Sequence, residues 1–171
     1  YYRINGMSTQ NKGVIPDIEL PVTWDIESVG ESSYPTAMEW DVIRPYRHKK
    51  FKVNSDLVDK VISNYEFRLI EEPNLNYLKK VRDRYDLNKN KKKLSLNLED
   101  RKIQKELRKD WLLQIENERR IKVGLKEFAS YKEMEDYNDS DNSFENKINL
   151  KDDYQLIEST NIINDFLEFE K

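Results

Sequence analysis

From residue 55 onward, apolar residues recur every three or four positions in several separate segments, and this helical period constrains the fold most. Ser55 is a favourable residue to cap the first helix, and Pro73 suits the first turn of the second. Gly124 is typical of a helix end. The predicted helices cover residues 55–70, 73–85, 97–124 and 152–169.

The apolar stripes of these helices are expected to form their core, because a one-sided apolar stripe on a helix usually faces the interior. The stripes comprise Leu57, Val58, Val61, Ile62, Tyr65 and Leu69; Leu75, Leu78, Val81 and Tyr85; Leu107, Trp111, Ile115 and Ile121; and Tyr154, Ile157, Ile162, Ile163, Phe166 and Leu167. The acidic residues 133–145 between the last two helices are predicted to form a loose loop.

Composition excludes several kinds of site. Charged residues make up 37% of the 171 residues, against about 25% in an average domain, so much of the chain is expected to be surface or extended helix. There is no Cys and one His. These counts exclude a disulfide framework, an all-Cys zinc site, a thiol nucleophile and a multi-histidine metal site.

The first part of the chain has a different character. Residues 1–24 are poor in charge and contain two β-favouring runs, 1–4 and 14–20, separated by Gly6 and Gly13. We expect two short strands joined by a loop. Residues 25–50 read as a linker that packs against another part of the structure, since Trp24 and Trp40 are unfavourable in water. The predicted fold class is α+β, a mainly α-helical C-terminal domain preceded by two short strands.

Charge is unevenly distributed. Residues 79–93 carry a net charge of +6 and residues 127–171 a net charge of −9. A solvated helix end explains the basic run best, and a partner-facing patch is the second explanation. The acidic tail would oppose counterion release, so nucleic acid is a poor partner. Binding of RNA or anionic lipid stays a third alternative, and such binding would collapse as salt rises.

No residue qualifies as a catalytic, cofactor-binding or metal-binding candidate. His48 is flanked by basic residues and is expected to be exposed, which argues against a Ser-His-Asp triad. Asp139, Asp141 and Glu145 lack the spacing and the central glycine of a calcium loop. The glycines match neither glycine-rich phosphate-binding motif.

Three short motifs near the start carry a resemblance to a known family. They are residues 1–6 (YYRING), 8–10 (STQ) and 12–18 (KGVIPDI). In this order they resemble the end of the protease core in the C-terminal processing peptidases, a family of serine proteases.

Later motifs are similar to the tail-specific branch of that family. They are residues 30–32 (GES), Trp40-Asp41 followed by Ile43 and Pro45, residues 95–98 (SLNL), Gly124-Leu125 and residues 150–153 (LKDD). Residues 37–39 (AME) depart from the Leu-Pro that commonly precedes the Trp-Asp pair in this branch.

The resemblance implies a periplasmic serine endopeptidase with a Ser/Lys dyad that cleaves proteins selected by apolar C-termini. It implies that the dyad, a PDZ domain and a signal peptide lie upstream, so Ser8 and Lys12 inherit no catalytic role and the fragment alone is inactive. Residues 1–24 would end the protease core, 25–50 would be a linker, and 51–171 would be a helical domain that encloses substrate or contacts a helical-repeat lipoprotein adaptor. No cofactor, nucleic acid or membrane span is expected.

A stand-alone helical protein-interaction module without enzymatic activity is the alternative. In that case the opening strands would pair within a small sheet of their own. The reading frame upstream of Tyr1 discriminates between the two: a PDZ sequence and a Ser/Lys pair support the protease, whereas a start codon there supports the module.

Overall fold

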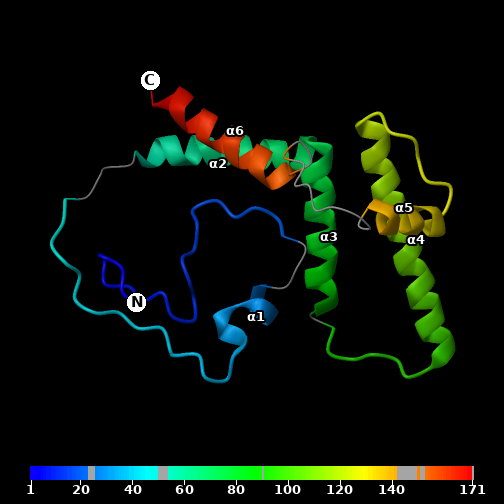
Figure 1. The fold of residues 1–171 in the computed structure, drawn as a ribbon, viewed down its shortest axis with the longest axis horizontal. Coiled ribbons are helices and arrows are strands. Elements are labelled where there is room, and N and C mark those ends of the chain that lie inside the picture. Colours follow the sequence, from blue (N-terminus) through cyan, green and yellow to red (C-terminus); the bar gives the residue numbers. More distant parts are fainter. Residues whose placement is uncertain (23–25, 50–53, 90, 142–149, 151–152, 171) are drawn as a thin grey trace.

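A computed structural model describes residues 1–22, 26–49, 54–89, 91–141, 150 and 153–170 (Figure 1). Helices dominate the described part of the chain from residue 54 onward. The elements are α1 (Ile26–Val29), the 3-10 helix η1 (Glu31–Ser33), α2 (Ser55–Glu71), α3 (Pro73–Lys89), α4 (Leu98–Lys122), α5 (Tyr131–Asp141) and α6 (Tyr154–Phe169).

The longer helices pack in sequence order, and the last one returns to the first. α3 runs away from the end of α2, α4 lies beside α3, and α5 crosses α4 (Figure 1). α6 then lies along α2 and also contacts α3. The helical period therefore predicted α2, α3, α4 and α6 correctly, and their ends differ from the expected ones by a few residues.

Asn and Asp side chains cap α2, α4 and α6 at their first turn. The Asn54 side chain accepts a hydrogen bond from the Asp56 amide, Asn97 accepts from the amides of Glu99 and Asp100, and Asp153 accepts from the Leu156 amide. Each cap satisfies an amide that has no partner within the helix. Ser55 is thus the first helical residue and not the cap.

The described buried apolar residues are few, and they lie where helices meet. They are Leu57, Val61 and Tyr65 of α2, Leu75 of α3, Ile115 of α4, Phe128 before α5 and Met134 of α5. Several predicted core residues are instead exposed, including Leu107 and Ile121 of α4 and Ile163 and Leu167 of α6. The helices are therefore correct, but only part of each apolar stripe is core.

The prediction of a loose acidic loop at residues 133–145 is wrong for its first part, because Tyr131–Asp141 forms α5. The Ser130 hydroxyl accepts from the Glu133 amide, and the Glu133 carboxylate accepts from the Ala129 amide. This arrangement resembles a capping box, a strong helix-start signal. Residues 142–149 lie outside the described part of the chain.

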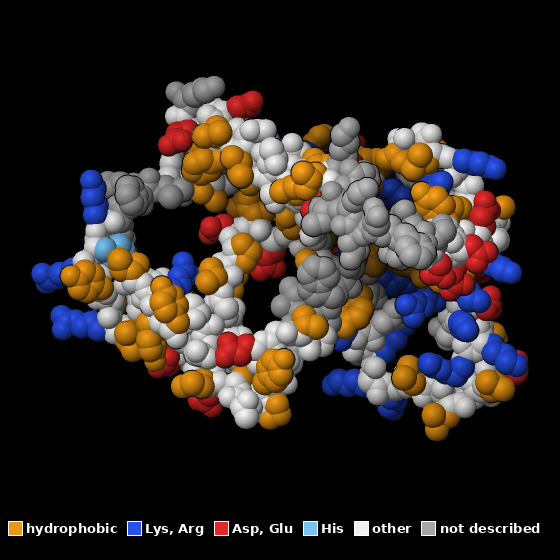
Figure 2. Space-filling model, viewed as in Figure 1, with side chains coloured by type: hydrophobic (Ala, Val, Ile, Leu, Met, Phe, Trp, Pro, Cys, Tyr) orange, Lys and Arg blue, Asp and Glu red, His pale blue; other side chains and the backbone are white. Residues whose placement is uncertain are grey.

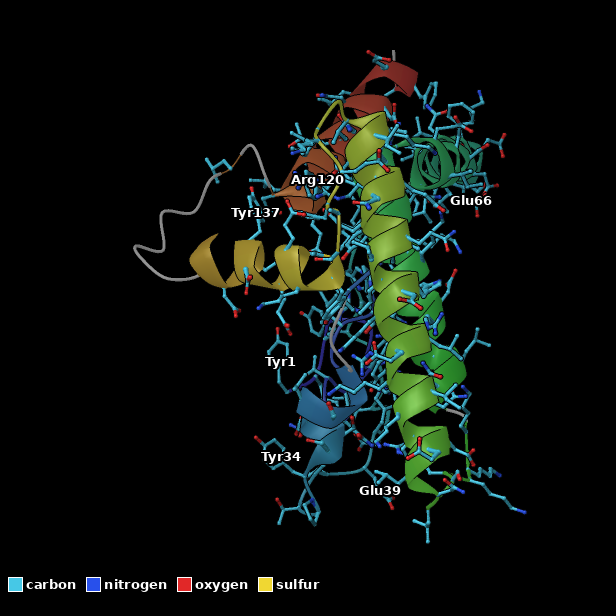
Figure 3. All side chains as sticks on the ribbon, turned by 90° about the vertical axis from the view of Figure 1, so that its right-hand side faces the viewer. Tyr1, Tyr34, Glu39, Glu66, Arg120 and Tyr137 are labelled. Carbon is cyan, nitrogen blue, oxygen red and sulfur yellow. The ribbon has the colours of Figure 1, made fainter. Side chains whose placement is uncertain are left out.

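The junction of α4 and α5 is built around a cation and two rings. The Arg120 guanidinium lies 4.0 Å from the Phe128 ring centroid and 5.5 Å from that of Tyr137, and Arg120 and Tyr137 are labelled in Figure 3. The Asn117 side chain exchanges two hydrogen bonds with the backbone of Phe128, at 2.8 and 2.9 Å. These contacts fix α5 against α4 and explain why its polar sequence is helical here.

The prediction of two strands in residues 1–24 is not supported. Among the described residues this part forms only isolated bridges, Tyr2 with Ser8 and Met7 with Val42. β-favouring residues form a strand only where a neighbouring strand pairs with them, and none does so here. The backbone carbonyls of Glu19 and Pro21 instead accept hydrogen bonds from side chains of α2 and α6.

The remaining predictions for residues 1–50 have mixed outcomes. Gly6 has φ of +84°, and a Cβ there would overlap the Ile43 carbonyl oxygen, so only glycine fits this turn. Trp40 is half-buried, with the Lys12 ammonium 3.8 Å above its ring. Trp24 lies outside the described residues.

Candidate docking surface on α6

The inward face of α6 carries carboxylates. Glu158 is 1% exposed, and Asp165, seven residues later, lies on the same side of the helix. Both face Arg68 of α2. Arg68 Nε donates to Glu158 Oε1 at 2.8 Å, and Asn161 Nδ2 donates to Glu158 Oε2 at 3.2 Å.

Arg68 joins the two carboxylates in one ionic cluster. Its Nη1 lies 2.8 Å from Asp165 Oδ2, and its Nη2 lies 2.8 Å from Glu158 Oε1. These two contacts lack the angular geometry of a hydrogen bond, so they act through charge alone, whereas the Nε contact is a true hydrogen bond. Burial alone would lower the pKa of Arg68, but the hydrogen bond to Glu158 and the negative charges of Glu158 and Asp165 outweigh burial and raise the pKa. The guanidinium is therefore permanently charged.

The outward face of α6 is apolar. Leu156, Thr160, Ile163 and Leu167 follow one another at spacings of four, three and four residues, which places them in one stripe along the helix. The three aliphatic side chains are between 45% and 59% exposed. Hydrophobic side chains gather over α6 and the neighbouring part of α2 in Figure 2.

α6 therefore presents two carboxylates inward, beside the half-buried Ile162 and Phe166, and exposes aliphatic residues on the opposite side. A buried carboxylate requires a partner, so the contacts with Arg68 keep Glu158 and Asp165 against α2. The apolar stripe then lies on the opposite side of α6. Within the described residues, no element covers this stripe. We call Leu156, Thr160, Ile163 and Leu167 the α6 stripe. Its chemistry suits docking on another apolar surface and offers no group for catalysis.

The segment before residue 22 is attached to this helix pair. The Tyr65 hydroxyl donates to the Glu19 carbonyl at 2.8 Å, and the Gln155 amide donates to the Pro21 carbonyl at 2.8 Å. Both carbonyls thus find donors on α2 and α6. The N-terminal segment is therefore hydrogen-bonded to both helices of the α2–α6 pair.

Tyr65 makes the stability of the α2–α6 pair decrease at alkaline pH. Burial raises the pKa of the Tyr65 hydroxyl above 10.0, and the nearby Glu158 and Glu19 raise it further. The folded state favours the neutral phenol, so this contribution is complete below the unfolded pKa and is lost as pH rises through the higher folded pKa. We expect the free energy of unfolding to fall above about pH 10 more steeply in the wild type than in Tyr65→Phe. Urea titrations at several pH values measure this difference, and parallel curves would contradict it.

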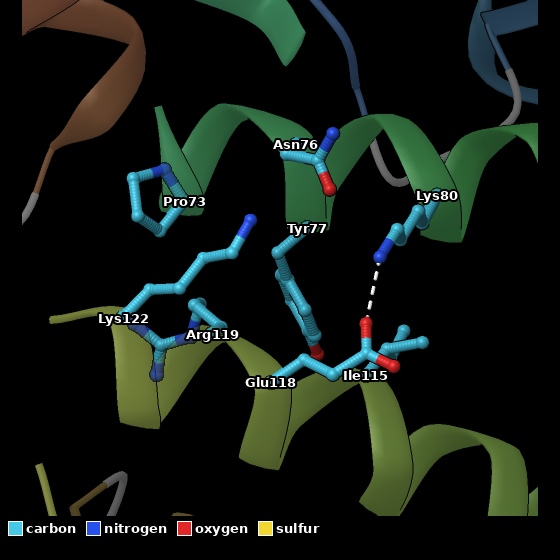
Figure 4. Close-up of a pocket in the computed structure, with 8 residues that line it drawn as sticks. All are labelled: Pro73, Asn76, Tyr77, Lys80, Ile115, Glu118, Arg119 and Lys122. Atoms are coloured by element: carbon cyan, nitrogen blue, oxygen red, sulfur yellow. Dashed lines mark hydrogen bonds and ion pairs between the residues drawn. The ribbon is translucent and has the colours of Figure 1, made fainter. Parts of the chain in front are cut away.

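A pocket between α3 and α4 contains three cations (Figure 4). Lys80 donates to Glu118 at 2.7 Å, and this bond lowers the pKa of Glu118. Arg119 is bonded to Glu116 and Asn74. The pocket also contains Lys122, Pro73, Asn76, Tyr77 and Ile115. Two of its cations are thus already neutralised by carboxylates, so the pocket serves to join the two helices.

The residues considered for chemistry in the sequence lie apart. Ser8 is buried, and its hydroxyl accepts from the Gln10 amide at 3.0 Å. Lys12 lies over Trp40, and the exposed His48 ring contacts the Tyr46 carbonyl at 2.8 Å. Within the described residues these three side chains form no common site, and no group of metal-ligating side chains is found there. Glu145 lies outside the described residues.

Sequence reasoning missed the direction in which α6 faces. It assigned Ile163 and Leu167 to the core and did not consider that Glu158 and Asp165 face inward. One signal was present: two carboxylates seven residues apart share a helix face, and Arg68 is a cation in the last turn of α2. The sequence does not show that α2 packs against α6, however, so it does not show that the two carboxylates face Arg68.

Among the described residues, no helix is both long enough and apolar enough to cross a membrane.

Two comparisons with known proteins agree. A family model described as the C-terminal domain of tail specific protease matches residues 24–168. The tail-specific protease of Haemophilus influenzae is 28% identical over 172 aligned positions, which cover 96% of this chain and 24% of that protein. The chain thus spans about a quarter of the length of this curated relative. Since the family model covers most of the chain, including all of α2 to α5 and nearly all of α6, the chain belongs to the family of C-terminal domains of tail-specific proteases.

Proposed function

We propose that this chain is the non-catalytic C-terminal part of a tail-specific serine endopeptidase, and that the α6 stripe docks it onto the rest of that polypeptide. The Ser/Lys dyad and the PDZ domain that reads apolar C-termini lie upstream in this proposal. The family match over residues 24–168 supports the assignment. The uncovered α6 stripe is the single observation that supports the docking role.

The chain divides into three parts in this proposal. Residues 1–24 complete the protease core, 25–50 are a linker and 51–171 are the helical domain. The family model begins at residue 24, which agrees with a boundary there. The strands expected in residues 1–24 would then form on pairing with core strands, since β-favouring residues form strands where a neighbour exists.

The occupant of the α6 stripe is the upstream part of the same polypeptide. The curated relative is about four times as long as the region it shares with this chain, so a large surface of the same protein is available to cover the stripe. Docking there would bury apolar area and hold the helical domain beside the catalytic core, where it can enclose substrate. A helical-repeat lipoprotein adaptor is the second candidate for this surface, and the parent enzyme would be periplasmic.

Because the proposal places the Ser/Lys dyad upstream, it predicts that the 171-residue chain alone does not hydrolyse a peptide with an apolar C-terminus. The full-length protein is expected to hydrolyse it, and to lose this activity when the upstream Ser is replaced by Ala. A fluorogenic peptide assay measures both. Hydrolysis by the isolated chain that disappears in Ser8→Ala would overturn the assignment of roles. A start codon directly before Tyr1, with no protease sequence upstream, would support the stand-alone interaction module instead.

A further inference from the structure

The loop that joins α3 to α4, together with the first residue of α4, exposes three leucines. Leu94, Leu96 and Leu98 have exposed fractions between 64% and 99%, and Leu96 is the most exposed of the three. Single exposed apolar residues are ordinary. Three alternating ones at the apex of one helix pair require an explanation.

Hydrogen bonds hold the polar residues of this loop away from the leucines. The Ser95 hydroxyl donates to Asp100 at 2.7 Å, and the Asn97 side chain accepts from the Glu99 amide at 2.8 Å. Alternate residues of an extended chain face opposite sides. With Ser95 and Asn97 turned back onto the start of α4, the leucines between and beside them face solvent in a fixed arrangement.

Basic residues surround the leucines. Residues 89–105 contain seven Lys or Arg and two acidic residues, a net charge of +5. Glu99 is paired with Lys102 at 3.0 Å, and Asp100 accepts from Ser95. Lys91, Lys92 and Lys93 are exposed, and none has a carboxylate partner among the described residues. Basic side chains accordingly gather around this end of α3 and α4 in Figure 2.

We propose that this tip surface, formed by Lys91, Lys92, Lys93, Leu94, Leu96 and Leu98, binds the surface of an anionic lipid bilayer. The lysines contact the headgroups and the leucines enter the boundary with the acyl chains, which is the pattern of interfacial membrane binding. A protruding apex suits a soft flat surface, because it offers no concave face to a folded partner.

Other partners fit the tip surface less well. It contains no aromatic side chain, whereas single-stranded nucleic acids are bound by stacking on aromatic rings. A second copy could offer its acidic residues, but the contact would be head-to-tail and would build a ring or an open chain of copies. The acidic α5 crosses α4 away from the loop, and α6 lies along α2 (Figure 1).

Co-sedimentation of the 171-residue chain with vesicles tests the proposal. We expect binding to vesicles of phosphatidylglycerol and phosphatidylcholine, and little binding to phosphatidylcholine alone. Replacing Lys91, Lys92 and Lys93 together by Ser is expected to weaken binding about 100-fold. Leu96→Ser is expected to weaken it at least about tenfold, since a buried leucine is lost. Raising the salt from about 0.1 M to about 1 M should release the protein.

Two control variants test whether vesicle binding depends on the tip surface or on the total charge and exposed apolar area of the chain. Lys49→Ser with Lys126→Ser and Lys132→Ser removes the same charge from exposed positions elsewhere, and Leu125→Ser removes another exposed leucine. Both are expected to bind like the wild type. Equal losses in test and control variants, or no preference for phosphatidylglycerol, would overturn the proposal. So would self-association in analytical ultracentrifugation that Leu96→Ser abolishes, in the absence of vesicle binding, because the partner would then be a second copy.

Discussion

Replacing Arg68 by Met is expected to destabilise the domain by about 3 kcal/mol. The change leaves the buried Glu158 and the half-buried Asp165 without a cation, and breaking a buried ion pair costs about 3–5 kcal/mol. The lower end applies because the Arg68 side chain is 23% exposed. Urea denaturation followed by circular dichroism measures the loss.

A triple replacement provides the control for this prediction. Arg68→Met combined with Glu158→Leu and Asp165→Leu removes all three charges, and such apolar replacements are often neutral or stabilising. We therefore expect the triple variant to regain most of the lost stability. A single Arg68→Met variant as stable as the wild type would mean that α6 does not depend on this cluster for its attachment.

The second large effect is expected for Leu75→Ala, with a loss of about 2–5 kcal/mol. Leu75 is 2% exposed and lies at the start of α3, the helix that contacts α2, α4 and α6. Removing its side chain leaves a cavity at the point where the helices converge.

Leu87→Ala is the matched control, because Leu87 belongs to the same helix and is 71% exposed. It is expected to change stability by no more than about 0.5 kcal/mol. Thermal unfolding measures both variants, and equal shifts in Tm would show that Leu75 does not belong to the core.

The helical period predicted α2, α3, α4 and α6 because these segments combine periodic apolar residues with start or stop signals such as Pro73 and Gly124. It failed for α5, whose sequence is acidic and contains few apolar residues. There the capping interactions of Ser130 and Glu133 and the packing of Tyr137 decide the structure. Local composition alone does not reveal contacts with residues that lie on another helix.

The candidate surface could be predicted only in part. An apolar stripe on α6 is visible in the sequence, but a single helix with apolar residues on several sides does not show which side faces inward. That choice depends on Arg68, which is 90 positions from Glu158 in the chain. The prediction of strands in residues 1–24 was wrong for a related reason. A strand forms only when another strand pairs with it, and the sequence of this segment does not show whether such a partner strand is present.

Thiol accessibility at the α6 stripe tests the central claim most directly. The chain contains no Cys, so Ile163→Cys introduces one reactive group on the stripe, and Glu135→Cys places a control on the exposed side of α5. Both are compared in the isolated chain and in a full-length protein without other cysteines. If the stripe docks onto the upstream domains, Ile163→Cys is alkylated at least about tenfold more slowly in the full-length protein, as a burial free energy above about 1.4 kcal/mol requires, while Glu135→Cys reacts equally in both. Equal rates at Ile163→Cys in the two proteins would contradict the account.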